Sequence, residues 1–392
     1  MNRYLLLILF YLCVKISIAS TILPSSDLPV LQIGNISQPR TKVNSLCRVY
    51  LSLDRVAEKP VSIKYKTVAG TAKPKKDFVS ISKVLVIPIG QQQGYFEITV
   101  IGDSLRQQNL QFTIELRKPK NCVLETSSAI VTINNANGSY LPTNNNGYTT
   151  PISYSGKRLV WSDEFNGNSL DTSSWNLEKG GGGWGNKELQ YYTGRPENVF
   201  VSNGNLVIEA RKENIGANQF TSARMTTKWK HEFQYGRVDI RAKLPVAKGL
   251  WPALWMLGSN ISTMKWPVCG EIDIMELIGT HPSRVYSTMH FANSANKHAQ
   301  HGGNFDLSGE DFSEAFHVYS MVWKKDSMMF YVDDHLFFTH SKNDPTISGY
   351  PYNAPFYFIF NLAVGGQWPG SPDDTTIFPQ RMFVDYIRVF DN

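Results

Sequence analysis

The sequence has few cysteines, few charged residues and only one long apolar run, and each scarcity excludes a class of protein. Four cysteines in 392 residues are too few for a disulfide framework. With 18% charged and 42% hydrophobic residues, 29 glycines and 20 prolines, the chain is not disordered, collagenous or a coiled coil. No segment has a convincing helical period, which argues against a helical fold.

The one apolar run lies at the N-terminus, from Tyr4 to Val14, after a basic start at Arg3. Small residues at Ser17 and Ala19 complete the three parts of a secretory signal. A membrane anchor would need about 20 apolar residues, and Lys15 interrupts this run. We therefore predict a signal peptide over residues 1–19, no membrane span in the mature chain, and secretion.

Removal of Cys13 with the signal leaves Cys47, Cys122 and Cys269. The first two lie in the same N-terminal region and could form a disulfide, which would leave Cys269 as a lone thiol. Sequons for N-glycosylation, which matter only if the host glycosylates secreted proteins, occur at Asn35, Asn137 and Asn260.

The net charge of +6 is a sum over unlike parts of the chain. Residues 20–140 hold 15 Lys/Arg against 8 Asp/Glu, whereas residues 141–392 hold 22 against 25. A single polyanion-binding surface is therefore not expected, and we predict no nucleic-acid partner. The aromatic content is more informative, because 9 Trp, 18 Tyr and 21 Phe are more than a core of this size needs.

Residues 28–136 contain short alternating strands separated by turn residues, the pattern of a β-sandwich. This region resembles a Calx-beta domain, which implies an immunoglobulin-like sandwich. In the calcium-binding members an acidic run supplies ligands where this chain has amides at 107–111, so we expect no calcium here. The domain is expected to be a spacer or adhesion module, and its basic charge is more simply a solvated face than a contact with acidic polymers. The matching segments are 70–72 with 77–78, 87–90, 98–103 and 130–134.

An Asn-rich segment without periodic hydrophobic residues, 137–157, is predicted to be a linker. Longer, more aromatic strands then fill residues 158–392, which predicts a large second all-β sandwich.

The residues that carry chemistry are those of the strand Glu271-Ile272-Asp273-Ile274-Met275-Glu276. Alternation places Glu271 and Asp273 on one face, and a β-bulge at Ile274-Met275 would return Glu276 to that face. Three acids in line are unfavourable as a merely solvated face. Retaining glycoside hydrolysis needs two such carboxyls, one nucleophile and one proton donor, and a middle acid can separate their pKa values.

This strand, with Trp251–Gly258 and Trp266–Gly270 before it, is similar to glycoside hydrolase family 16, in its laminarinase branch. Further matching segments are 161–165, 186–192, 222–224, 361–370 and 385–389. The resemblance implies a concanavalin A-like β-jelly-roll with an open cleft, acting as an endo-β-1,3-glucanase on β-glucan. By the same resemblance Glu271 is the nucleophile, Asp273 its assistant and Glu276 the acid/base. Gln367 departs from the branch, which more often has Asn there.

The resemblance and the affinity of sugar rings for aromatic faces together predict the substrate-binding residues. They are Asn186, Asn198, Arg224, Trp251, Trp255, Trp266, His290 and Trp368, whereas Trp161 and Trp323 are assigned to packing. The resemblance also implies one structural calcium, held by Glu164, the Gly204 carbonyl and Asp385. No cofactor is predicted for catalysis, and we expect a monomer.

Several alternatives stay open. His298 and His301 have a zinc-like spacing, but we expect a solvated Gly/Asn-rich loop there, and Cys269 is expected to be a packed small side chain. The chain could be a non-catalytic β-glucan-recognition protein, for which loss of an outer acid would be the mark, or a mixed-linkage β-1,3-1,4-glucanase.

Overall fold

The computed structural model describes residues 28–135, 138–345 and 349–391, so the predicted signal peptide and Asn137 lie outside the described residues. These residues form two compact units. The first contains the described residues up to Gly102 together with Leu110–Ile133, and the second contains Asp103–Asn109 and the chain from Asn134 onward. Among the described residues, no helix combines the length and apolar character needed to cross a membrane.

The first unit is a β-sandwich, as the alternating sequence predicts. In β3, for example, Cys47, Val49 and Leu51 are buried while the residues between them are exposed, which gives the strand one core face and one solvent face. One sheet has the order β6 (Gln93–Val100), β3 (Ser45–Leu53), β1 (Val30–Ile33), β8 (Val123–Leu124). The other has the order β2 (Ile36–Pro39), β9 (Ser128–Asn134), β7 (Leu110–Lys120), β4 (Val61–Ala69), β5 (Ser82–Ile87).

The possible disulfide of the first unit is absent. Cys47 and Cys122 are both buried free thiols, as is Cys269 in the second unit. Burial raises the pKa of Cys47 and of Cys269 to about 11, so neither thiol is activated. For Cys269 this agrees with its predicted role as a packed side chain.

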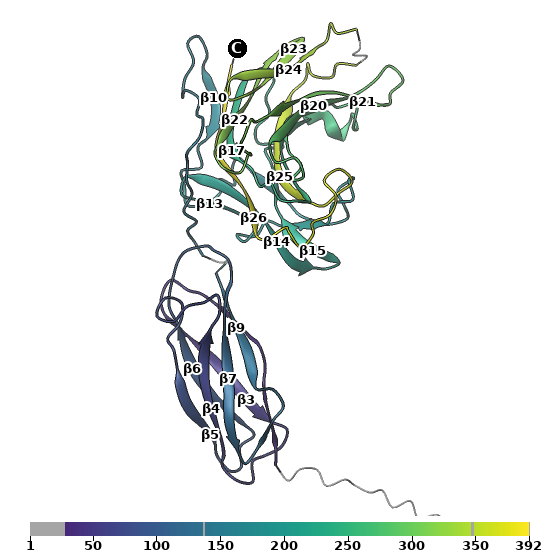
Figure 1. Ribbon diagram of the computed structural model, residues 1–392. Helices are drawn as coiled ribbons and strands as arrows, with labels where there is room; N and C mark the ends of the chain where they lie inside the picture. Colours follow the sequence, from purple (N-terminus) through teal and green to yellow (C-terminus); the bar gives the residue numbers. More distant parts are fainter. Residues whose placement is uncertain (1–27, 136–137, 346–348, 392) are drawn as a thin grey trace, which may run out of the picture. The chain divides into compact units, whose positions relative to one another are not determined.

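The second unit is also a sandwich, and its two sheets face each other as separate layers (Figure 1). The seven-stranded sheet has the order β11 (Asn176–Glu178), β16 (Arg224–Thr226), β25 (Phe356–Val364), β18 (Leu250–Gly258), β19 (Glu271–Glu276), β20 (Arg284–Ala292), β21 (His298–Asp306). The path of the opposite sheet is β12 (Gln190–Tyr192), β15 (Asn218–Ser222), β14 (Asn205–Ile215), β26 (Gln380–Phe390), β17 (Gly236–Lys243), β22 (His317–Lys324), β23 (Ser327–Val332), β24 (His335–Ser341). On that sheet β10 (Leu159–Asp163) pairs with β26 and β13 (Val199–Ser202) with β14. A single 3₁₀ turn, η1 (Ser259–Ser262), is the only helical element of the described residues.

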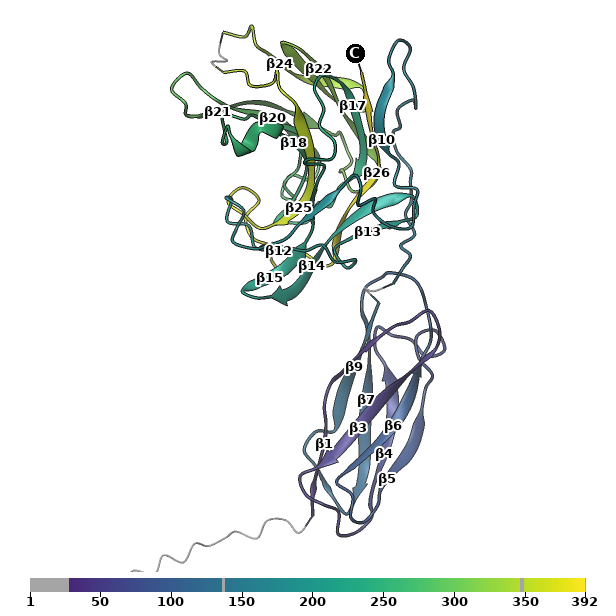
Figure 2. The ribbon, with the colours of Figure 1, turned by 180° about the vertical axis from the view of Figure 1, so that it is seen from behind.

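A large aromatic core separates these two layers. Trp323, Phe330 and Phe360 are buried between them, and every residue of β25 is buried. Much of the aromatic excess is therefore in the core, and several of the other aromatic residues lie on the open side of the seven-stranded sheet. That sheet curves around its open side, with β18 beside β25 at its centre (Figure 2).

The segment predicted as an Asn-rich linker lies along the second unit. Its Leu141 and Thr150 are buried, and Thr150 N donates a 2.9 Å hydrogen bond to the Tyr386 hydroxyl. The Tyr154 hydroxyl donates to Asp239 at 2.7 Å. Polar side chains can satisfy a non-periodic segment in this way, so the composition of a linker does not prevent it from packing.

Candidate active site

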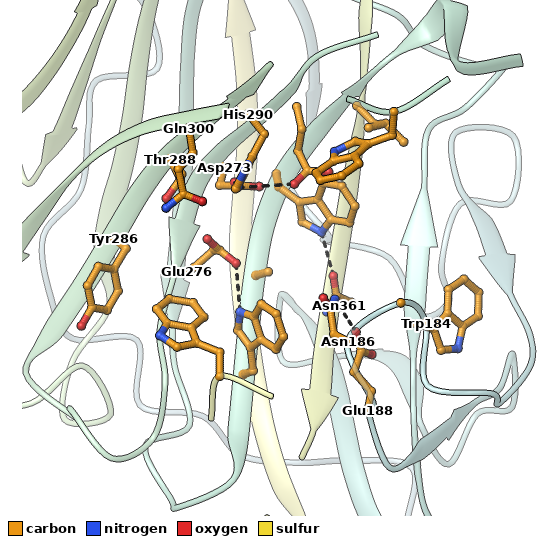
Figure 3. A pocket seen from close by; sticks show the side chains of 18 of the residues that line it. Trp184, Asn186, Glu188, Asp273, Glu276, Tyr286, Thr288, His290, Gln300 and Asn361 are labelled. Atoms are coloured by element: carbon orange, nitrogen blue, oxygen red, sulfur yellow. Dashed lines mark hydrogen bonds and ion pairs between the residues drawn. The ribbon is translucent and has the colours of Figure 1, made fainter. Parts of the chain in front are cut away.

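The acid strand β19 contains the predicted bulge. On β18, Leu254 pairs with Met275 and the next residue, Trp255, pairs with Asp273, so Ile274 is the extra residue. The β20 register shifts over the same interval. Ile274 and Met275 both point into the core. The acid after them, Glu276, therefore returns to the same face as Asp273, where Figure 3 shows both carboxyls in the pocket.

His290 lies directly across from Glu271 in the β19–β20 register. Its Nε2 is 3.1 Å from Oδ2 of Asp273 and 3.7 Å from Oε1 of Glu271. The strand partner thus places one imidazole over two of the three acids. These three residues are the one group of three potential side-chain metal ligands found among the described residues, with ligand atoms within 4.8 Å of one another.

Burial is the main influence on all three acids. Burial, reinforced by the charge of Asp273, raises the pKa of Glu271 to about 8 and that of Glu276 also to about 8. Burial raises the pKa of Asp273 well above its usual range. His290 opposes the shift of both glutamates, and Arg224 also opposes that of Glu271. The strand can therefore hold a protonated acid at neutral pH, as general acid catalysis requires.

Two tryptophans donate indole N–H hydrogen bonds that orient polar side chains on the cleft floor (Figure 3). Trp251 Nε1 donates to Oε1 of Glu276 at 2.9 Å, and Trp255 Nε1 donates to Oδ1 of Asn361 at 2.7 Å. Each tryptophan thus gives one edge to a polar partner and leaves apolar ring surface to the cleft.

The acids open into a cleft of about 830 Å³, large enough for several sugar rings. Trp266 and Trp368 are 44% and 41% exposed, and Trp368 meets Trp251 edge-to-face at 5.4 Å between ring centroids. The structure brings together these predicted substrate-binding residues: Asn186, Arg224, Trp251, Trp255, Trp266, His290 and Trp368. Trp323 is buried and Trp161 packs against the core, as their assignment to packing predicts.

Asn198 is a correction to the predicted set. It is fully buried and its Nδ2 donates to the Glu209 carbonyl at 3.0 Å and to Thr221 Oγ1 at 2.9 Å. All of this hydrogen bonding is internal, so Asn198 braces a loop to β14 and β15 and does not face the cleft.

The expectation of a loop at His298 and His301 is also corrected, because both lie in strand β21. A spacing of three places them on opposite faces of a strand. His298 lines the cleft, with Nε2 2.8 Å from Nδ1 of His290, whereas His301 Nδ1 is 3.0 Å from Nδ1 of His340. The two histidines therefore do not share a metal site.

Further cleft residues escaped the sequence reasoning. Tyr286, Thr288 and His290 alternate along β20 (Figure 3), and strand alternation could have found the first two. The complete set of missed polar and aromatic cleft residues is Trp184, Glu188, Tyr286, Thr288, His298, Gln300 and Asn361.

The predicted calcium positions converge on the backbone of β26. Glu164 follows β10, which pairs with β26 on the C-terminal side of Asp385. Gly204 precedes β14, which pairs with β26 on the N-terminal side of Asp385. Both carboxylates, however, are paired with arginines. Arg388 donates two 2.8 Å hydrogen bonds to Glu164, and Arg241 donates a 2.7 Å hydrogen bond to Asp385. An oxygen-only donor set suits calcium, but a cation there would have to compete with these guanidinium groups.

Comparison with known proteins agrees with this geometry. Residues 186–388, more than half of the chain, match the model of glycosyl hydrolases family 16, and residues 37–137 match the Calx-beta domain. A beta-glucanase of Rhodothermus marinus is 42% identical over 59% of this chain and 84% of its own length. Glucan endo-1,3-beta-glucosidase A1 of Niallia circulans is 40% identical over 62% of this chain, which spans 39% of that protein. The laminarinase catalytic domain of Thermotoga maritima is 48% identical, covers 60% of this chain and 98% of its own, and superposes with a TM-score of 0.56.

Proposed function

Because the chain belongs to glycosyl hydrolases family 16, we propose that it is a secreted, endo-acting β-1,3-glucanase that retains the anomeric configuration. The observation that carries the proposal is the bulged acid strand, whose three carboxyls line the floor of an aromatic cleft. The β-glucanase and laminarinase relatives support the substrate class.

In the proposed mechanism the two outer glutamates divide the chemistry. Glu276, protonated because its pKa is raised to about 8, gives its proton to the glycosidic oxygen as that bond to the anomeric carbon breaks. Glu271, whose ionised form is favoured by both His290 and Arg224, attacks the anomeric carbon from the opposite face as a carboxylate and forms a glycosyl–enzyme ester. Glu276 then removes a proton from water, which attacks the same carbon and releases Glu271. Both glutamates return to their starting protonation states.

Asp273 and His290 both influence the pKa values of the two glutamates. Protonated Asp273 can donate to Glu271 while that carboxyl is negative, and His290 at 3.1 Å from Asp273 can stabilise the same charge. No metal takes part in a double displacement by two carboxyls. The calcium predicted at Glu164, Gly204 and Asp385 is proposed to act on stability alone.

The Glu271→Gln variant tests the proposal. It should fold, bind laminarin and release no reducing sugar, whereas the matched amide variant Gln367→Asn should retain activity. Proton NMR of the first product formed by the wild-type enzyme should show the β-anomer. Wild-type activity in Glu271→Gln would disprove the assignment, and an unaltered chain that binds laminarin without cleaving it would instead be a glucan-recognition protein.

The linkage preference and the first unit need separate experiments. We propose laminarin-type β-1,3-glucan as the preferred substrate. Comparison of laminarin, lichenan, agarose and carrageenan would reveal a mixed-linkage enzyme by faster release of sugar from lichenan. The Calx-beta unit is proposed as a spacer or adhesion module. Deletion of residues 20–140 should then reduce turnover of insoluble glucan more than that of soluble glucan, and an equal loss on both would indicate folding support.

A further inference from the structure

The turn after β16 presents a tryptophan that the cleft does not use. Trp229 is 80% exposed, the most exposed tryptophan of the described residues, and it has a left-handed backbone with φ 64°. A bulky residue at positive φ is a genuine outlier, and such conformations persist mostly where the surrounding structure enforces them. The backbone of Trp229 therefore has a conformation that glycine adopts without strain. Because the indole is exposed, its burial does not offset that strain.

The turn that carries Trp229 is rigidly braced. Thr227 N donates to the Phe358 carbonyl at 3.0 Å, and Thr227 Oγ1 donates to the His231 carbonyl at 2.8 Å. Asn176 Nδ2 donates to the Lys228 carbonyl at 2.8 Å. The turn is thus tied to β25 and to β11, so a ligand that stacks on the exposed ring does not have to order the backbone that carries it.

This turn continues the face that contains the cleft. Leu257 lines the cleft and pairs across the strands with Tyr357, whose ring lies 5.6 Å from Nζ of Lys228. The same Nζ lies 4.7 Å from the Trp229 ring. Along the chain, Arg224 of the cleft is five residues from Trp229, a span of at most about 16 Å in extended chain.

We propose that Trp229 is an outer stacking platform for the β-glucan chain, beyond the cleft that holds the scissile bond, with Lys228 as a hydroxyl-binding neighbour. The proposal rests on the proposed function, and it names the long polymer as the preferred form of the substrate. A neutral glucan fits this site because a sugar ring stacks on an indole face while an ammonium group donates hydrogen bonds to hydroxyls.

The test compares a long with a short substrate in the full chain. Trp229→Ala should raise KM for laminarin roughly five- to tenfold, the equivalent of one aromatic contact, and leave kcat and kcat/KM on laminaritetraose within about twofold. Trp229→Phe should lie between Trp229→Ala and the wild type. Trp229→Gly should have the same KM for laminarin as Trp229→Ala. Its Tm should be higher than that of the wild type, because glycine adopts the positive φ without strain. The matched control is the exposed Met264→Ala, which should change neither substrate.

Unchanged laminarin KM in both Trp229→Ala and Trp229→Gly would overturn the platform, as would equal losses on polymer and tetrasaccharide. Electrophoresis in laminarin-containing native gels separates this outcome from failure of the proposed function. If the wild type cleaves nothing but is retarded by laminarin, reduced retardation of Trp229→Ala still supports the platform, and equal retardation of the two proteins disproves it.

Discussion

Trp251 donates its indole N–H to Oε1 of Glu276 at 2.9 Å. The donor comes from β18 and the acceptor from the position that immediately follows the β19 bulge. The hydrogen bond favours the ionised carboxylate, against the burial and the Asp273 charge that together raise the pKa of Glu276. The pKa of Glu276 is therefore set by opposing influences, and single substitutions can remove two of them, the Trp251 hydrogen bond and the Asp273 charge.

Trp251→Phe should raise the pKa of Glu276 further, because it removes the donor and leaves the burial. A general acid must be protonated in the first step, so the basic limb of the kcat/KM profile should move to higher pH. The measurement is a pH–rate profile on laminarin from pH 5 to 10. A basic limb that stays in place or moves to lower pH would contradict the role of Glu276 as the acid.

Asp273→Asn should have the opposite effect on the same limb. It replaces an acid whose ionisation raises the pKa of both Glu271 and Glu276 by an amide that cannot ionise, so the basic limb should shift to lower pH. Activity at the optimum should fall by about 100- to 10,000-fold, because the proton shared with Glu271 is also lost. Retained full activity with an unshifted limb would show that Asp273 does not act on the pair.

Much of this site follows from the sequence because strand alternation and one bulge determine which acids share a face. Asn198 does not follow, since a buried asparagine with internal hydrogen bonds and a sugar-binding one have the same one-letter code. The strand at His298–Asp306 does not follow from the sequence either, because its glycines are typical of a loop. A Cβ at Gly303 would lie 2.9 Å from Cβ of Phe338, so glycine there reflects close packing of a strand and not a loop.

The positions of cysteines in the sequence likewise do not determine whether a disulfide forms. Two cysteines in one domain are compatible with a disulfide, but only the distance and direction between them can decide it. The two cleft histidines form a contact that the sequence does not suggest. His298 contacts His290 because their strands pair, and residue spacing alone does not reveal this pairing.

Glu276→Gln should stabilise the protein at alkaline pH. The folded-state pKa of Glu276 is raised to about 8 from its ordinary value of 4.5, so the folded state binds the proton more tightly. Its contribution to stability is present in full below pH 4.5 and is lost as pH rises through 8. The neutral amide avoids this loss, so its Tm should exceed that of the wild type by several degrees at pH 9 and match it near pH 4. Calorimetry at both pH values tests this, and a constant difference would contradict it.

Calcium should raise Tm if Glu164, Gly204 and Asp385 hold the ion. Millimolar calcium should stabilise the EDTA-treated protein by RT ln(1 + [L]/Kd), which is about 2.7 kcal/mol at 100 times Kd. The Asp385→Asn variant should show no such shift, and kcat should change in neither protein. A Tm that is insensitive to calcium would mean that Arg388 and Arg241 neutralise these carboxylates without a metal.

Arg106→Ala should destabilise the second unit by about 2–4 kcal/mol. The guanidinium group is buried, with its carbon 3.7 Å from the Phe200 ring centroid and Nη1 3.8 Å from Oε1 of Glu209. It also donates to the carbonyls of Gly138 and Pro196, each at 3.1 Å. The loss should be at the lower end of the range because Arg211 and Arg381 still pair with Glu209. Urea unfolding of Arg106→Ala beside Arg117→Ala, an exposed arginine of the first unit, measures the difference. A change below about 0.5 kcal/mol in both variants would show that the Arg106 side chain adds nothing to the stability of the second unit.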